Sequence, residues 1–335
     1  MGALSFKGAS LCCAVAVLFA TARAAGEPDA PVSRDNLYAV KFATPTHGWA
    51  VGEFGVILHT GDGGKSWRLQ ASDTTEPLFG VDFVDEKRGW AVGRSGIILH
   101  TGDGGHTWQR QSSGVDDKHL FRVDFVDAEL GCAVGDWGTI VLTRDGGKTW
   151  RVNSLPNDVI INGLWLVDRT RGWITGELGM IMVTEDGGET WTERRSGVDK
   201  TLFAIQFADA STGWAVGIDA LILHTTDGGD TWQIRHGSAE MAVLDQVGFA
   251  QALDYPSLYG LSMSGQNGIA VGDTGSVYLT ADGGLTWERQ TVPFEWGLSW
   301  FRDVSTTAGG HGALVGAEGH HPRIAEGRLQ VEEKR

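Results

Sequence analysis

The chain has 335 residues, of which 42 are acidic and 27 are Lys or Arg, so its formal net charge at neutral pH is −15. This excess of acid argues against nucleic acid and anionic membrane surfaces as partners, because both recruit clustered Lys and Arg. Of the three cysteines only Cys132 lies beyond residue 25, which excludes an intramolecular disulfide in the rest of the chain.

The first 25 residues have the pattern of a secretory signal peptide. Lys7 gives a positive start, residues 11–20 (LCCAVAVLFA) are apolar but too short for a membrane-spanning helix, and small residues follow in TARAAG. We therefore expect an exported, periplasmic protein with no direct membrane insertion after cleavage. Losing Lys7 and Arg23 with the leader makes the net charge −17. Residues 26–35 are the expected linker to the folded domain.

Beyond the linker an eight-residue motif of the form T-x-D-G-G-x-[ST]-W occurs six times, at intervals of 41 or 42 residues except for the last, which is 55. We refer to it as the box. Its aspartates and tryptophans are Asp62 and Trp67, Asp103 and Trp108, Asp145 and Trp150, Asp186 and Trp191, Asp227 and Trp232, and Asp282 and Trp287. A second pattern, such as GWAVGEFGVILHT (48–60), precedes each box, and before that comes an alternating segment such as LFGVDFVD (78–85). A fixed repeat of this length is the signature of a repeat architecture.

Each repeat contains four short strand signals, which predict one blade of a β-propeller. The C-terminal residues 312–327 keep the glycines of the pattern but lose the box, and 328–333 are the candidate closing strand. We therefore predict an all-β, seven-bladed propeller of four-stranded antiparallel blades over residues 36–335, six with a box and one degenerate. The alternative is a six-bladed ring with a tail.

The box itself has a structural interpretation. A tight hairpin between the third and fourth strands needs positive φ angles, which the Gly pair supplies, while the Asp side chain can accept bonds from turn N–H groups. The Trp would fill the wedge between blades. A group repeated in every blade argues against a catalytic centre, and one carboxylate per turn is a poor ligand set for calcium. We expect no catalytic residue, metal or cofactor.

The combined pattern GWAVGxxGxIxxTxDGGxxW resembles the photosystem II stability/assembly factor family, and the box alone is the Asp box of bacterial neuraminidase (BNR) repeats. The resemblance covers about residues 36–327. It implies a seven-bladed, non-enzymatic chaperone that binds and stabilises a membrane-associated client protein during assembly. In a phototroph the client would be a photosystem II reaction-centre precursor on the thylakoid lumen side, and elsewhere an envelope protein.

Two surface features are candidate partner sites. The turns between the second and third strands share one face of the predicted ring and form an acidic collar with exposed rings, made of Glu53, Phe54, Arg94, Asp136, Trp137, Glu177, Asp219, Asp273 and Glu318. We hypothesise that this collar binds a basic client segment. The alternative is that these are only solvated turns. An insertion at 236–257 falls on the same face, and part of it reads as an amphipathic helix, which either binds a partner or packs on its blade.

A third group of residues occupies equivalent places on the predicted inner strands and would line the axial channel. These are Lys41, Asp82, Asp124, Trp165, Gln206 and Ser262, with Asp303 as the seventh. Such residues commonly hold ordered water.

The rival function is a glycan-active or glycan-binding propeller, such as a sialidase-like glycoside hydrolase. No pair of carboxylates stands out from the repeat, as a glycosidase requires. The three histidines His311, His320 and His321 lack the spacing of a metal site. A cleft holding two carboxylates beside Trp137, Trp296 or Trp300 would favour sugar, and a flat acidic surface would favour protein.

Overall fold

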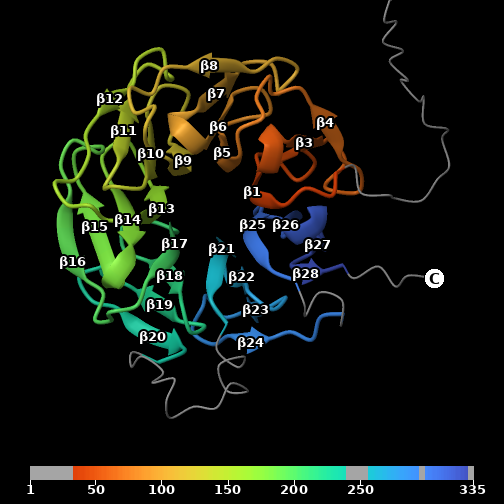
Figure 1. The fold of residues 1–335 in the computed structure, drawn as a ribbon. Coiled ribbons are helices and arrows are strands. Elements are labelled where there is room, and N and C mark those ends of the chain that lie inside the picture. The colour runs from red at the N-terminus through yellow and green to blue at the C-terminus, as the bar shows by residue number, and fades with distance from the viewer. Residues whose placement is uncertain (1–32, 239–255, 294–298, 331–335) are drawn as a thin grey trace, which may run out of the picture. The chain divides into compact units, whose positions relative to one another are not determined.

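A computed structural model describes residues 33–238, 256–293 and 299–330, and these form seven four-stranded antiparallel sheets. The sheets stand around a central axis as a seven-bladed β-propeller (Figure 1). Within each blade the four strands are consecutive in sequence, from blade 1 (β1–β4) to blade 7 (β25–β28). The predicted fold is therefore confirmed, and the six-bladed alternative is wrong.

The strands follow the repeat. The innermost strands are β1 (Leu37–Phe42), β5 (Leu78–Phe83), β9 (Leu120–Phe125), β13 (Ile161–Leu166), β17 (Leu202–Phe207), β21 (Leu258–Ser264) and β25 (Phe301–Thr306). The second strands are β2 (Gly48–Gly52), β6 (Gly89–Gly93), β10 (Gly131–Gly135), β14 (Gly172–Gly176), β18 (Gly213–Gly217), β22 (Asn267–Gly272) and β26 (Gly312–Gly316). The third strands are β3 (Ile57–Thr60), β7 (Ile98–Thr101), β11 (Ile140–Thr143), β15 (Met180–Thr184), β19 (Ile222–Thr225), β23 (Val277–Thr280) and β27 (Arg323–Ala325). The outer strands are β4 (Arg68–Gln70), β8 (Gln109–Gln111), β12 (Arg151–Val152), β16 (Thr192–Arg195), β20 (Gln233–His236), β24 (Glu288–Arg289) and β28 (Arg328–Leu329).

The second strand of each blade is the most deeply buried, because both of its faces pack against neighbouring blades. In β2 all five residues of GWAVG are buried, whereas the residues of β4 are exposed or half-buried. A strand covered on both faces needs an apolar run rather than an alternating one. This explains why the GWAVG pattern, and not the outer strand, carries the strongest sequence signal.

Aromatic stacking joins one blade to the next. The Trp49 ring of blade 1 lies on the Phe83 ring of blade 2, with centroids 3.6 Å apart, and Trp108 meets the same Phe83 edge-on at 5.8 Å. The Trp49 indole also donates a hydrogen bond to the carbonyl of Gly104 in the blade 2 box, at 3.2 Å. Trp90, Trp173 and Trp214 make the same bond to the next blade's box. Each of these boxes is therefore held by the blade before it.

Within each box the aspartate side chain accepts hydrogen bonds from its own turn. In blade 1, Asp62 accepts a bond from the Thr60 hydroxyl at 2.8 Å, and the backbone N–H and hydroxyl of Ser66 donate to its two carboxylate oxygens at 2.9 and 2.6 Å. All six boxes repeat the pattern. Both oxygens are thus engaged inside the turn.

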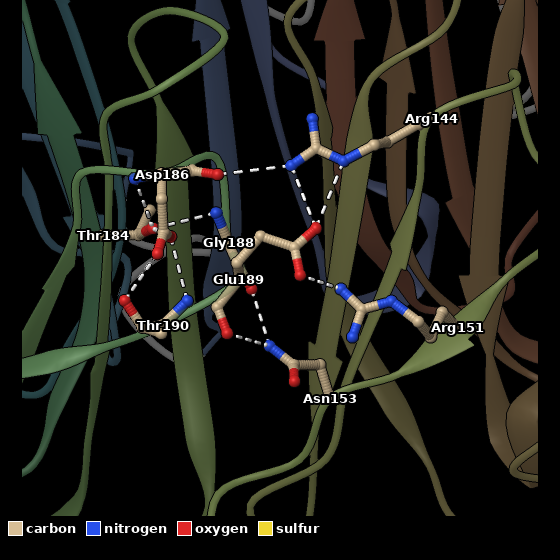
Figure 2. Close-up of polar contacts among 8 residues, drawn as sticks. All are labelled: Arg144, Arg151, Asn153, Thr184, Asp186, Gly188, Glu189 and Thr190. Carbon is tan, nitrogen blue, oxygen red and sulfur yellow. Dashed lines mark hydrogen bonds and ion pairs between the residues drawn. The ribbon is translucent and has the colours of Figure 1, made fainter.

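The junction between blades 3 and 4 is built without an indole. Blade 3 has the buried Cys132 where blades 1, 2, 4 and 5 have a Trp, so no indole reaches the blade 4 box. Figure 2 shows the replacement: Arg144 and Arg151 pair with Glu189 of the blade 4 box, and Arg144 donates to the Asp186 carbonyl at 3.2 Å. Asn153 donates to the Gly188 carbonyl at 2.7 Å. At this junction an ionic cluster, and not an indole, holds the box to the preceding blade.

Blade 7 closes the ring without borrowing a strand from the N-terminal end of the described chain. The closing contacts are hydrogen bonds to β1, from Val40 N–H to the Asp303 carboxylate at 3.1 Å and from Phe42 N–H to the Ser305 hydroxyl at 3.0 Å. The degenerate blade predicted from 312–327 is present, and the first two residues of the predicted closing strand form β28. The predicted leader and residues 239–255 of the insertion lie outside the described residues. None of the helices in the described ranges has the length and apolarity that a membrane span requires.

Candidate functional site

Every innermost strand begins with a β-bulge, and the extra residue of each bulge lies at one mouth of the axial channel. In β1 the pairing runs from Leu37–Gly52 directly to Ala39–Val51, which leaves Tyr38 unpaired. The equivalent residues are Phe79, Phe121, Asn162, Phe203, Tyr259 and Arg302. Bulges re-aim side chains and are frequent beside functional sites. Seven of them in register make a ring of seven side chains.

These side chains form a pocket with a volume of about 480 Å³, which we call the mouth pocket. Its lining comprises all seven bulge residues together with Arg122, Ile160, Asp273 and Trp300. The volume lies within the range of roughly 300–1,000 Å³ that is usual for ligand sites. Because Asp273 belongs to a turn between second and third strands, the mouth pocket opens on the face that carries the predicted collar.

Aromatic rings form most of one side of the mouth pocket. Trp300 stacks on Tyr38 with centroids 6.1 Å apart and an interplanar angle of 4°, and the contacts continue to Phe79 at 5.6 Å and on to Phe121 at 5.7 Å. These four rings come from blades 7, 1, 2 and 3. Asn162 of blade 4 interrupts the series, and its amide donates to the Leu202 carbonyl at 3.2 Å.

Two guanidinium groups, those of Arg122 and Arg302, also line the mouth pocket. Arg122 pairs with Asp303 across the channel, with its Nη1 3.3 Å from Oδ2. Arg302 instead lies over the Tyr259 ring, with its Cζ 4.4 Å from the centroid. Burial, and next the nearby Arg122 cation, lower the pKa of Arg302 below its ordinary value.

Two predicted collar carboxylates hold tyrosines of the mouth pocket. The Tyr38 hydroxyl donates to Glu53 at 2.9 Å, and the Tyr259 hydroxyl donates to Asp273 at 2.8 Å. Burial, followed by the bond to Glu53, raises the pKa of Tyr38 to about 12. These two carboxylates therefore fix the orientation of pocket rings.

The other predicted partner residues surround the mouth pocket without lining it. Asp136 accepts from the His119 N–H at 2.8 Å and Glu177 from the Ile160 N–H at 3.0 Å. Asp219 pairs with the buried Lys200 at 2.8 Å. Arg94 lies 3.9 Å from Glu76, and the Glu318 side chain is exposed.

Two apolar residues of the collar are exposed, together with the charged Arg94 and Glu318. Phe54 and Trp137 are 65% and 56% exposed, and Leu178, which was not predicted, is 79% exposed. All three have φ near +54°, a left-handed conformation that is uncommon for bulky side chains. Ser95, Thr274 and Glu318 have the same φ in the equivalent turns, so this conformation belongs to the repeated turn and not to the apolar side chains.

Below the mouth pocket the channel holds a second cavity of about 310 Å³, lined by the predicted inner column. Column residues bond from blade to blade: Asp82 accepts from Phe125 N–H at 2.8 Å, Asp124 from Leu166 N–H at 2.6 Å, and Lys41 pairs with Asp82 at 2.6 Å. Burial, then repulsion from Asp82, raises the pKa of Asp124 to about 7 against the opposing effect of Lys41.

The prediction that Asp303 is the seventh column residue is wrong. Ser305 pairs with Ala313 and takes the column position, while Asp303 pairs with Val315. The inner strand of blade 7 begins with Phe301, where five blades have Leu, and ends with Thr306, where four blades have Phe. Asp303 still lines the second cavity, where it binds Arg122 and the Val40 N–H.

Sequence reasoning missed the bulge residues, which make up most of the mouth pocket. The available signal was the dipeptide that opens each inner strand, Leu-Phe in three blades, Leu-Tyr in two, Ile-Asn in blade 4 and Phe-Arg in blade 7. A strictly alternating pattern places the second residue on one face of the blade, and only the bulge turns it to the mouth. Among the described residues no group of three His, Cys, Asp or Glu side chains is arranged to hold a metal ion.

The chain is similar to known proteins in both sequence and fold. The sequence model of the family described as "Photosynthesis system II assembly factor YCF48" matches residues 27–114, 111–196 and 193–298. No curated protein sequence matches the chain. A solved structure described as "YCF48 bound to D1 peptide" is 20% identical, covers 88% of this chain and 94% of its own, and superposes with a TM-score of 0.69.

Two further solved structures are similar. YCF48 from Cyanidioschyzon merolae is 19% identical over 88% of this chain and 96% of its own, with a TM-score of 0.66. The GH74 xyloglucanase from Xanthomonas campestris is 13% identical over 85% of this chain and 51% of its own, with a TM-score of 0.68. At these identities the superpositions show a common propeller fold.

Proposed function

Because the chain belongs to the YCF48 family of photosynthesis system II assembly factors, we propose that it is an exported, non-enzymatic propeller that binds a segment of a membrane or envelope protein and stabilises that protein during assembly. The observation that carries the proposal is the mouth pocket, a concave, ring-lined site on a rigid scaffold. A related propeller is described as bound to a D1 peptide, which makes a peptide segment the ligand class we expect.

The chemistry of the pocket supports binding rather than hydrolysis. Within the described part of the chain its lining contains one carboxylate, Asp273, which is bonded to the Tyr259 hydroxyl. Glycosidases of the common kinds need two carboxyl groups across the scissile bond. The lining also offers two arginines, Arg122 and Arg302, where a sialidase uses three.

A glycan-binding or glycan-active propeller is the second candidate, favoured by the ring-lined pocket and the fold likeness to a xyloglucanase. Of the tryptophans that would favour sugar, Trp300 lines the mouth pocket, Trp137 does not, and Trp296 lies outside the described residues. The acidic collar and the insertion at 236–257 are further predicted contacts of the client. Export to the periplasm, or to the thylakoid lumen in a phototroph, is also part of the proposal.

The test is site-specific photo-crosslinking in cells of the source organism. A photoreactive phenylalanine analogue replaces Phe121 in the mouth pocket, and a control carries it at Leu285, which is 48% exposed in the blade 6 box. We expect one membrane or envelope protein to dominate the adducts at position 121 and to be missing at 285. Equal adducts at both positions, or none at 121, would contradict the proposal, and a glycan screen would then follow.

A further inference from the structure

We propose that His47 and His59 form an open binding site for a divalent transition-metal ion such as Zn²⁺, on the face of the propeller that carries the boxes. His47 belongs to the turn before β2, and His59 lies in β3 of the same blade. Neither residue lines the mouth pocket, so this inference goes beyond the proposed function and does not depend on it. The sequence alone did not lead us to expect a metal here.

The two imidazole rings are separated by a distance that suits a shared metal ion. Their centroids are 5.7 Å apart and their planes differ by 27°. With a metal–nitrogen bond of about 2.0–2.1 Å, two imidazoles on one tetrahedral ion have ring centroids roughly 5 Å apart. A side-chain movement of less than about 1 Å would therefore bring both rings onto one ion.

The His47 ring is held in the orientation that a metal ligand needs. Its Nδ1 lies 3.2 Å from Oε1 of Glu86, in the turn between β5 and β6 of blade 2, and 3.1 Å from the Thr46 hydroxyl. Donation from Nδ1–H to the carboxylate leaves the lone pair of His47 on Nε2. Ligating histidines commonly donate their other ring N–H to a carboxylate, which fixes the tautomer and makes the ligand more basic.

The His59 ring has a nitrogen without a partner. Its Nε2 is buried and makes no hydrogen bond with the described residues, although buried polar atoms normally have a partner. The Trp49 indole holds the ring from one side, with centroids 4.9 Å apart. Burial, followed by the nearby His47, His106 and Arg68, lowers the pKa of His59. The ring is therefore neutral at neutral pH, which is the state that binds a metal.

Both rings border one exposed position of the box. Residue 61 is an exposed glycine, and a Cβ placed on it would lie 3.8 Å from His47 Nε2 and 4.0 Å from His59 Cε1. The glycine keeps this space free of protein, so an ion could reach the two rings from solvent. The boxes of blades 3 to 6 carry a side chain at the equivalent position, namely Arg144, Glu185, Thr226 and Ala281.

The second histidine distinguishes blade 1 from blade 2. In blade 2 the equivalent of His59 is His100, which packs on Trp90 with centroids 5.0 Å apart, but Arg88 precedes the second strand where blade 1 has His47. Packing on a tryptophan is thus shared, and the pair of imidazoles is not. Since no group of three His, Cys, Asp or Glu side chains in the described ranges is arranged around a metal, water would complete the coordination.

The experiment measures Zn²⁺ binding to the purified protein, without a histidine tag, by isothermal titration calorimetry at neutral pH. We expect His47→Gln and His59→Gln each to weaken binding about tenfold or more, because loss of even an outer-shell partner costs about 10–100-fold in metal affinity. His100→Gln is the matched control and should bind Zn²⁺ as the wild type does. Mg²⁺, which prefers oxygen ligands, should not compete.

Thermal melts provide a second readout. An ion that binds only the folded protein raises its melting temperature, so Zn²⁺ should stabilise the wild type and His100→Gln but not His47→Gln. Melts without metal show whether each variant folds. The side chain of His47 is 33% exposed, so His47→Gln should fold even if the loss of the His59 ring from the Trp49 stack does not allow it.

Absence of Zn²⁺ binding to the wild type would overturn the inference. The same affinity in His47→Gln as in the wild type would also overturn it, because the ion would then lie on other histidines. The proposed function is tested separately, since His47→Gln should retain the client adduct at position 121. Loss of Zn²⁺ binding with an unchanged adduct is therefore the expected result.

Discussion

The two faces of the propeller are built from the same repeat but use it in opposite ways. On the face that carries the boxes, polar groups are bonded to each other: the box aspartates within their turns, the strand tryptophans to box carbonyls, and Glu189 to two arginines. On the opposite face the bulges aim five rings, an amide and a guanidinium at a cavity, and Phe54, Trp137 and Leu178 stand exposed. The repeated residues stabilise the scaffold, whereas the residues that line the mouth pocket vary from blade to blade.

The strongest test of this contrast substitutes the same residue type on both sides. Trp90 is fully buried, stacks on Phe125 at 3.5 Å and donates to Gly146, so Trp90→Ala should lower the free energy of unfolding by about 3–5 kcal/mol. Trp137→Ala on the opposite face should change it by less than about 0.5 kcal/mol. Urea denaturation measures both. Similar losses in the two variants would show that Trp137 is a structural residue.

Acid should lower the stability of the protein as the box aspartates become protonated. Hydrogen bonds from the Thr107 N–H and hydroxyl hold the pKa of Asp103 at about 2, and Asp227 and Asp282 are depressed to the same value. A depressed folded-state pKa stabilises the protein above the unfolded value near 4, and this contribution is lost as the pH falls toward 2. Melting temperatures between pH 5 and 2 should fall steeply. Asp103→Asn should flatten the fall, whereas Asp117→Asn, on a side chain 80% exposed, should not.

The contribution of the axial channel to stability should depend on pH in the opposite sense. The folded-state pKa of Asp124, about 7, lies above the unfolded value, so its contribution to stability is complete below about pH 4 and is lost as the pH rises through 7. Asp124→Asn keeps an acceptor for the Leu166 N–H and removes the charge. We expect the variant to melt at a higher temperature than wild type at pH 8 and at a similar one at pH 4. An identical pH profile in both proteins would refute the assignment.

The ionic junction between blades 3 and 4 should show the smallest effect. The side chains of Glu189, Arg144 and Arg151 are 41–53% exposed, so Glu189→Gln should cost about 0.5–1 kcal/mol, and less at high salt. Urea denaturation at low and high ionic strength measures the loss. Glu288→Gln, on an exposed outer strand, provides the control and should be neutral. A larger loss that salt does not reduce would indicate a packing role for Glu189.

The fold could be predicted from the sequence because each blade repeats a buried strand, a glycine turn and a stacking ring at fixed spacing. Even blade 7, which has no box, kept its glycines at 312, 316 and 319 and was recognised from them. The weak point was blade 7, whose inner strand has Phe301 at its start and Thr306 at its end instead of the usual Leu and Phe. Without these two residues as a guide, Asp303 was aligned at the position that Ser305 occupies.

The mouth pocket could not be predicted in the same way, because a bulge is a property of strand pairing and not of hydropathy. Tyr38 and Arg302 share neither charge nor polarity, yet the same unpaired position brings them to one cavity. The collar, in contrast, was found from its charge pattern, but its carboxylates are largely bonded to neighbouring backbone and tyrosine groups. Charge alone does not reveal whether a carboxylate is free to meet a partner.

Since no described strand is shared between blades, every connection between an outer strand and the next inner strand is a site where the chain could be cut and its ends rejoined without dividing a sheet. Circular permutants of this protein should therefore assemble the same seven-bladed ring from seven different starting points. The order of the blades along the chain would change while their order around the axis stayed the same. A permutant opened between blades 3 and 4 would test whether a junction without the indole, held by the ionic cluster and the shared apolar core, can close the ring.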